Sequence, residues 1–301
     1  MKNLIKQILK EYAEEQEKVL VIPSLKIFNY DWNTLQQFLK SKGNPKWKIL
    51  GDLDLRGKPI ESLENLQSVG GDLDLENTPI ESLGNLQSVK GYLDLRNTPI
   101  ESLGNLQHVG GNLVLKNTPI KTLGNLQSVN NTLILGDSLI ESLGNLQYVG
   151  GHVDLENTTI ESLGNLQSVD RTLNLSNSSI KSLGKLTSVG GDLHLTETVI
   201  ESLGKLQHVG GDLDLYNTTI KSLGNLQYVG GNLDLRNTPI ESLGKLQSVG
   251  NDLDLSFASI KSLGDLKSVD GVLFLYNTPL SKKYTEKEIS EMVKVEGDIY
   301  V

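Results

Sequence analysis

Residues 70–89 have the sequence GGDLDLENTPIESLGNLQSV, and this 20-residue unit recurs along most of the chain. Alignment at this period runs from Leu53-Asp54-Leu55 to Leu273-Phe274-Leu275 and gives twelve copies. Self-similarity at a fixed period predicts a repeat architecture instead of a single globular core. Six positions of each copy are aliphatic, and in the quoted copy they are Leu73, Leu75, Ile80, Leu83, Leu86 and Val89.

The Leu-x-Leu element of each copy predicts a short strand. Side chains alternate along a strand, so both leucines point into the core and the residue between them points to solvent. The other four aliphatic positions are three residues apart, which suits a tight chain that turns inward once per short segment. One coil cannot bury six aliphatic side chains alone, but stacked coils bury them all, at about 1.5–3 kcal/mol for each side chain.

Turn residues recur at fixed places between the aliphatic positions. Proline sets φ near −65° in the turn, and the Gly70-Gly71 pair and Gly84 permit a positive φ or a close approach at two corners. We expect the asparagine after each strand to form a buried amide ladder that satisfies free backbone groups. These asparagines are Asn77, Asn97, Asn117, Asn157, Asn177, Asn217, Asn237 and Asn277.

The pattern L-x-L-x-x-N-x-x-I-x-x-L-x-x-L, from about Ile49 to Leu280, resembles a leucine-rich repeat of the short, 20-residue, bacterial or phage-like type. The V-G-G-x-L-x-L element preceded by L-G-N-L also resembles the coils of receptor L-domains. The resemblance implies a repeat β-solenoid, a right-handed coil with one long parallel sheet and small helical caps at both ends. It also implies turns or short strands on the outer face, and binding of other macromolecules.

Three segments follow from the pattern: an N-terminal helical cap at 1–48, twelve 20-residue leucine-rich repeats at 49–280, and a C-terminal cap at 281–301 that contains a helix and a final strand. The N-terminal segment has two helical patterns. Asp31 is the expected N-cap of the second helix, which carries Leu35, Phe38 and Leu39. We expect the two tryptophans, Trp32 and Trp47, to seal the first coil.

The C-terminal segment contains its own start signal. Thr285-Glu286-Lys287-Glu288 is a capping-box sequence for a helix that carries Ile289, Met292 and Val293. Residues 295–301 then copy the spacing of residues 69–75, which predicts a thirteenth strand.

Composition limits the classes of partner. The net charge is −9 and the pI is near 5.1, which argues against nucleic acid or an anionic membrane as the main partner. The chain has no cysteine, so it has no disulfide and no thiolate metal site. Residues 1–11 are charged and amphipathic and do not resemble a signal peptide, so we expect a cytoplasmic protein, or one in the host cytoplasm if a phage encodes it.

The solvent-facing strand positions differ among the copies, so we look there for function. The C-terminal half combines aspartates, which would steer a basic protein partner, with aromatic side chains, which are typical anchors. The predicted partner-binding residues are His194, Asp214, Tyr216, Asp234, Arg236, Asp254, Phe274 and Tyr276.

Other interpretations of the aspartates stay open. Neighbouring arginines and solvent could screen them, which would make the carboxylates a device for solubility. Calcium is a further alternative, although it takes about six to eight oxygens and a flat carboxylate ladder offers fewer. We assign no metal site and no cofactor.

The sequence predicts no enzyme. The histidines His108, His152, His194 and His208 are scattered along the array, and we assign no catalytic residue. The leading hypothesis is a non-catalytic scaffold that recognises a protein partner through the strand surface. The alternatives are a protein that sequesters a small molecule or peptide, such as a phage-type inhibitor of a host factor, and a structural spacer in an assembly.

Overall fold

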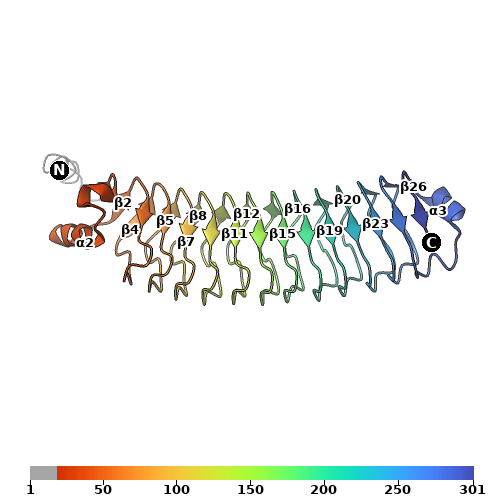
Figure 1. The fold of residues 1–301 in the computed structure, drawn as a ribbon, viewed down its shortest axis with the longest axis horizontal. Helices are drawn as coiled ribbons and strands as arrows, with labels where there is room; N and C mark the ends of the chain where they lie inside the picture. Colours follow the sequence, from red (N-terminus) through yellow and green to blue (C-terminus); the bar gives the residue numbers. More distant parts are fainter. Residues whose placement is uncertain (1–18) are drawn as a thin grey trace. The chain divides into compact units, whose positions relative to one another are not determined.

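A computed structural model describes residues 19–301 of the chain, and the first helical pattern, in residues 1–18, lies outside the described residues. The chain is a parallel β-solenoid in which successive 20-residue coils stack with equivalent residues in register (Figure 1). It forms two compact units. Unit 1 extends to Ile134 and includes Gly144–Leu146, and unit 2 holds Leu135–Leu143 and Gln147–Val301.

Each coil contributes two short strands, one at Leu-x-Leu and one that ends in the valine. The first kind forms the leucine sheet of each unit and the second forms the valine sheet. We expected one long sheet with turns or short strands on the outer face. The short outer strands are present, and they pair into a second parallel sheet.

The bounds of the strands follow the repeat. The valine sheet of unit 1 contains, in order, β1 (Leu20–Ile22), β2 (Trp47–Ile49), β4 (Leu66–Val69), β6 (Ser88–Val89), β8 (His108–Val109) and β10 (Ser128–Val129), and its leucine sheet contains β3 (Leu53–Asp54), β5 (Leu73–Asp74), β7 (Leu93–Asp94), β9 (Leu113–Val114) and β11 (Leu133–Ile134). The valine sheet of unit 2 contains β12 (Tyr148–Val149), β14 (Ser168–Val169), β16 (Ser188–Val189), β18 (His208–Val209), β20 (Tyr228–Val229), β22 (Ser248–Val249), β24 (Ser268–Val269) and β26 (Lys294–Val295), and its leucine sheet contains β13 (Val153–Asp154), β15 (Leu173–Asn174), β17 (Leu193–His194), β19 (Leu213–Asp214), β21 (Leu233–Asp234), β23 (Leu253–Asp254), β25 (Leu273–Phe274) and β27 (Ile299–Tyr300).

The core is a set of aliphatic columns that run through the stacked coils. The six aliphatic positions of each complete coil are buried, as the spacing predicts. Backbone bonds hold the coils together; for example, the N–H of Leu213 donates to the carbonyl of Asn232 at 2.8 Å. Each coil therefore lends both apolar surface and backbone partners to the next one.

The asparagine after each strand is exposed, and the predicted buried amide ladder is wrong. Asn77 has a φ of 56°, in the left-handed region that asparagine tolerates, and this conformation turns its side chain outward. The amides still form a ladder at the surface, where Asn97 Nδ2 donates to Asn77 Oδ1 at 3.1 Å. Thr78, the next residue, is the buried one, because its short hydroxyl reaches back and donates to the carbonyl of Leu75 at 2.7 Å.

The glycine pairs serve close packing of the backbone. Gly230 does not have a positive φ, but a Cβ at this position would lie 2.1 Å from the carbonyl oxygen of Gly210 in the preceding coil. Of the two reasons expected for these glycines, the close approach is the one that applies.

The N-terminal cap packs against the first coil of unit 1 and pairs with its valine strand. Asp31 accepts the N–H of Asn33 at 2.9 Å and caps helix α2 (Trp32–Ser41), as predicted. Trp47 is fully buried, and its ring lies 6.1 Å from the ring of Trp32. A 3-10 helix, η1 (Leu25–Phe28), joins β1 to this helix. Both tryptophans are buried, as the predicted sealing role requires.

The C-terminal cap contains the predicted helix and strand. Thr285 and Glu288 form the capping box of α3 (Glu286–Met292), and β27 pairs with β25 in the repeat register. Ile289 and Val293 lie four residues apart and take the buried face, whereas Met292 is exposed.

A third side of each coil, around residues such as Glu201 and Ser202, belongs to neither sheet. On this side of unit 2 the coils are joined in pairs. Isolated bridges link Ser202 to Ser222 and Ser242 to Ser262. A salt bridge accompanies each of these pairs, for example Glu201 with Lys221 at 2.6 Å. Two coils, 40 residues, are therefore the period of this side, although each sheet repeats every coil.

Neither helix in residues 19–301 has the length and apolar character needed to cross a bilayer.

We expect Leu173→Ala to lower the free energy of unfolding by about 2–5 kcal/mol, because Leu173 is fully buried in β15, a strand that is paired on both sides. The adjacent Asn174 is half-buried and accepts the N–H of Ser176 at 3.1 Å, so Asn174→Ala should cost about 1 kcal/mol. A urea titration measures both losses. Equal losses would mean that the assignment of the strand faces is wrong.

The two-coil period gives a matched pair of glycines, Gly204 and Gly224, with φ values of 60° and 62°. A Cβ on Gly204 meets nothing within 4 Å, whereas one on Gly224 lies 2.5 Å from the carbonyl oxygen of Gly204. Gly204→Ala should cost about 1–2 kcal/mol for the left-handed backbone alone. Gly224→Ala should cost clearly more in the same urea titration, because the backbone must also move, and a loss no larger than that of Gly204→Ala would contradict the pairing.

Candidate functional site

The predicted partner-binding residues of the strand centres form one row across the leucine sheet of unit 2. His194 pairs with Asp214, Asp214 with Asp234, and Asp234 with Asp254, each in parallel register. The row continues from Asp254 to Phe274. We call the strand surface from β17 to β27 the acidic face. All of these side chains are half-buried at its surface.

Arg236 connects three of the predicted residues. Its Nε lies 3.0 Å from both carboxylate oxygens of Asp234 and 3.6 Å from Asp254 Oδ2. Its guanidinium carbon lies 5.2 Å from the centre of the Tyr216 ring, within cation–π range. The hydrogen bond to Asp234 raises the pKa of Arg236 above its usual range. Tyr216 is therefore covered on one side by the guanidinium and is not a free anchor.

The strand-centre aspartates hold the turn that follows each strand. Asp214 Oδ1 accepts the N–H of Tyr216 at 2.9 Å, and Asp234 and Asp254 accept the N–H two residues later in the same way. Asn174 does this as well, with Ser176. The structural role therefore requires an oxygen acceptor and does not require a charge.

A second row of carboxylates and amides, two residues earlier, joins one coil to the next. Asp212 Oδ1 accepts the N–H of Asn232 at 2.7 Å, Asn232 Oδ1 accepts the N–H of Asp252, and Asp252 Oδ1 accepts the N–H of Val272. A Cβ on Gly231 would lie 2.1 Å from Asp212 Oδ1, so glycine leaves the room for this bond. This role was not predicted from the sequence, although the predominance of Asp and Asn at the position was its signal.

Three aromatic rings form a cluster at the C-terminal end of the acidic face. Phe274 and Tyr300 stack with 5.4 Å between their ring centroids, and Tyr276 lies 5.9 Å from Tyr300 and 6.2 Å from Phe274. Tyr276 and Tyr300 are 42% and 40% exposed, which leaves both rings available at the surface. The nearby Asp298 carboxylate raises the pKa of Tyr300.

Tyr300 was absent from the predicted set. The alignment of residues 295–301 with the repeat already placed it at a strand centre, so the sequence carried the signal.

Charge is unevenly distributed on the acidic face. Each coil presents three outward positions on this face: the strand centre and the residues two before and two after it. Arg236 is the only arginine or lysine at these positions. Seven carboxylates lie there: Asp192, Asp212, Asp214, Asp234, Asp252, Asp254 and Asp298. The surplus of negative charge is therefore six, counting the histidine as neutral.

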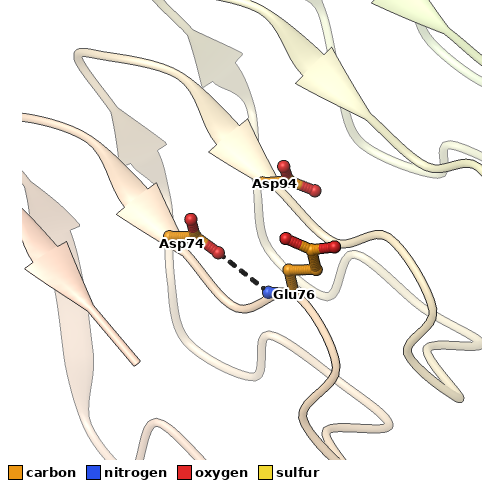
Figure 2. Close-up of side chains that lie close together, drawn as sticks. All are labelled: Asp74, Glu76 and Asp94. Carbon is orange, nitrogen blue, oxygen red and sulfur yellow. Dashed lines mark hydrogen bonds between the residues drawn. The ribbon is translucent and has the colours of Figure 1, made fainter. Parts of the chain in front are cut away.

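A tighter carboxylate group lies in unit 1. One oxygen each of Asp74, Glu76 and Asp94 fall within 4.8 Å of one another (Figure 2). Asp74 Oδ1 also accepts the N–H of Glu76 at 3.0 Å. The sequence did not predict this group, because only the register of β5 and β7 brings the three oxygens together.

The chain supplies its own cations to this group. Arg56 lies 2.9 Å from Asp74, and Arg96 lies 2.6 Å from Asp94 and 3.5 Å from Glu76. The hydrogen bond to Asp94 raises the pKa of Arg96. A calcium ion would have to compete with both guanidiniums and would find three carboxylates instead of the about six to eight oxygens that it takes. The arrangement is suited to internal charge balance.

The histidines do not assemble a catalytic group. His152 is exposed on the leucine sheet, and His194 is half-buried in the acidic face. His108 Nδ1 lies 3.0 Å from Ser128 Oγ on the valine sheet, a contact that the sequence analysis missed. No carboxylate of residues 19–301 hydrogen-bonds to this pair, so the third member of a Ser-His-Asp arrangement is absent there.

Comparison with models of known protein families gives no match for this chain. A comparison with curated proteins likewise finds no significant relative.

We expect Arg96→Met to lower the free energy of unfolding by about 1–3 kcal/mol, because the nearly buried carboxylate of Asp94 loses its guanidinium. Arg171→Met is the matched control, since Arg171 is exposed, and it should change stability by less than about 0.5 kcal/mol. Thermal or urea unfolding measures both. Equal and small effects would show that Arg96 does not balance the carboxylate group.

Proposed function

We propose that this chain is a leucine-rich-repeat type of scaffold without catalytic activity, and that its acidic face binds a basic protein. The observation that carries the proposal is the combination of seven carboxylates and one guanidinium with a cluster of exposed tyrosines at one end. The repeat resemblance supports it, because such solenoids commonly present one strand surface to a macromolecule.

The carboxylates are suited to attract a basic partner. All of them except Asp298 accept a backbone N–H group and are half-buried, so they create a negative potential without any rearrangement. Asparagine makes the same backbone bonds in other copies, so these bonds alone do not explain the frequency of aspartate. An excess of one sign of charge on one face steers association with a partner of the opposite sign.

The aromatic cluster is suited to anchor the partner once it has arrived. Tyrosine presents a large apolar ring and a hydroxyl, and it is enriched at interface positions with high binding energy. Tyr276 and Tyr300 support each other by stacking, which holds their side chains in place before a partner binds. Attraction and anchoring are thus assigned to different residues, and kinetics can separate them.

The partner is unidentified, so the experiment uses a displayed library of random 15-residue peptides selected on the full chain. We expect the enriched sequences to be rich in lysine and arginine. Replacing Asp214, Asp234 and Asp254 together by Asn should slow association about 10-fold at low salt and flatten its salt dependence. Replacing Tyr276 and Tyr300 by Ala should speed dissociation about 10-fold instead.

Matched controls come from other surfaces of unit 2. Changing Glu161, Glu201 and Glu241 to Gln removes the same charge from the third side of the coils. Tyr148→Ala and Tyr228→Ala remove exposed rings from the valine sheet. If the selected peptides are not basic, or if these controls weaken binding as much as the acidic-face variants, the proposal is wrong. A library that yields no binder would favour the alternative of a structural spacer.

A further inference from the structure

The valine sheet of unit 1 has one more strand at its N-terminal edge than the leucine sheet has. The N-terminal cap supplies β1 and β2 to the valine sheet, but β3 is the first strand of the leucine sheet and lies at its edge. The cap follows the coil path as far as Pro23, whose carbonyl accepts the N–H of Gly51 at 3.1 Å. The chain then leaves this path and enters η1 at Leu25. Residues 19–48 therefore contribute no strand that precedes β3.

Backbone acceptors are left open at this edge. Between the first and second coils, the N–H groups of Leu53 and Leu55 in the first coil donate to the carbonyls of Asp72 and Asp74 in the second coil. Each coil thus offers two carbonyls to the coil before it. The corresponding carbonyls next to the cap belong to Asp52 and Asp54, and no residue of the described range 19–301 donates to them. Unpaired groups along a strand edge are a template for an additional strand.

A cleft lies beside these acceptors. Its volume is about 550 Å³, and its lining comes from the cap, with Leu25 and Tyr30, and from the first coil, with Asp52, Asp54, Arg56 and Lys58. Sites for small ligands commonly have about 300–1,000 Å³. The cleft therefore has room for a few residues of extended chain, with the apolar side of the cap on one wall and the strand edge on the other.

The side chain of Asp54 indicates the chemistry of the occupant. It is 68% exposed, whereas the equivalent Asp74 side chain is 6% exposed. The difference has a cause in the repeat: Arg56 of the preceding coil reaches forward to Asp74 at 2.9 Å. Arg236 reaches forward to Asp254 in the same way, at 3.6 Å. Residues 19–48 place no coil before Asp54, so no arginine of the described chain reaches it from that side.

The cations already in the cleft do not replace that arginine. Arg56 lies closer to Asp74 than to Asp54, at 2.9 Å against 3.7 Å. Lys58 donates to the carbonyl of Tyr30 at 3.4 Å. A strand added before β3 in the repeat register would bring its own guanidinium to Asp54, two residues after the strand centre.

We propose that the open edge of β3 binds an extended, arginine-containing peptide segment as an additional parallel strand. Parallel orientation follows from the sheet, in which all pairings of β3 and its successors are parallel, and from the arginine, which reaches the next coil in this orientation. This site lies in unit 1 and is independent of the acidic face.

The probe is a fluorescein-labelled, end-capped peptide with the sequence SATARG, measured by fluorescence anisotropy with the full chain. Its alanines occupy the inward positions, where Leu25 limits the space, and their N–H groups would donate to the carbonyls of Asp52 and Asp54. N-methylation of either alanine should weaken binding about 10-fold or more, because it removes one of these donors. N-methylation of the threonine, whose N–H faces away from β3, should change affinity by less than about 2-fold.

A protein variant tests the arginine. Asp54→Asn keeps the acceptor for the N–H of Arg56, as Asn174 does for Ser176, but removes the charge. It should weaken SATARG about 10-fold and should have little effect on a peptide with glutamine in place of arginine. Asp154→Asn, at the same position of a coil in unit 2, is the control and should leave binding unchanged.

Three results would overturn the proposal. One is the absence of SATARG binding to the full chain. If binding then appears after deletion of residues 2–18, the edge is assigned to the chain's own first residues and not to a separate peptide. Another is an equal loss from N-methylation at threonine and at alanine, which would exclude strand pairing in this register. The last is an equal loss from Asp154→Asn.

Discussion

Stacking of the coils is the constraint on which the remaining structure depends, because no 20-residue coil can bury its own six aliphatic side chains. Each coil covers the leucines of its neighbour and accepts its backbone N–H groups, as Asn232 does for Leu213. Close stacking also requires glycine where two backbones approach, as at Gly230. Stability is thus distributed over many similar interfaces between neighbouring coils.

The polar side chains of the strand surface serve the same stacking. Where a strand centre is Asp or Asn, its side chain closes the following turn, and the other row connects successive coils, as Asp212 does with Asn232. Both rows need only an oxygen acceptor, so the fold accepts either residue. The choice between Asp and Asn is then free to set the charge of the surface, and the acidic face is where aspartate dominates.

The surface features of the molecule occur where one coil differs in sequence or path from its neighbours. In unit 1, residues 19–48 pair with the valine sheet only and leave the edge of β3 open beside a cleft. In the last two coils of unit 2, Phe274, Tyr276 and Tyr300 lie close together, and Tyr300 stacks on both of the other rings. In unit 1, Arg56 and Arg96 neutralise the carboxylates of Asp74, Glu76 and Asp94, which would otherwise repel one another. Each feature comes from a difference between neighbouring coils.

The sequence by itself determined the coil, the Leu-x-Leu strands, both helix caps and the final strand, because aliphatic period and capping residues act locally along the chain. It also placed His194, Asp214, Asp234, Asp254 and Phe274 in one row, since an unbroken 20-residue period fixes the register. Only the tertiary structure decided that the outer strands form a second sheet, that asparagine is exposed and threonine buried, and that β3 has an open edge. These outcomes depend on the backbone conformation at each corner and on where the cap leaves the coil path, and neither is encoded in the spacing of side chains along one copy.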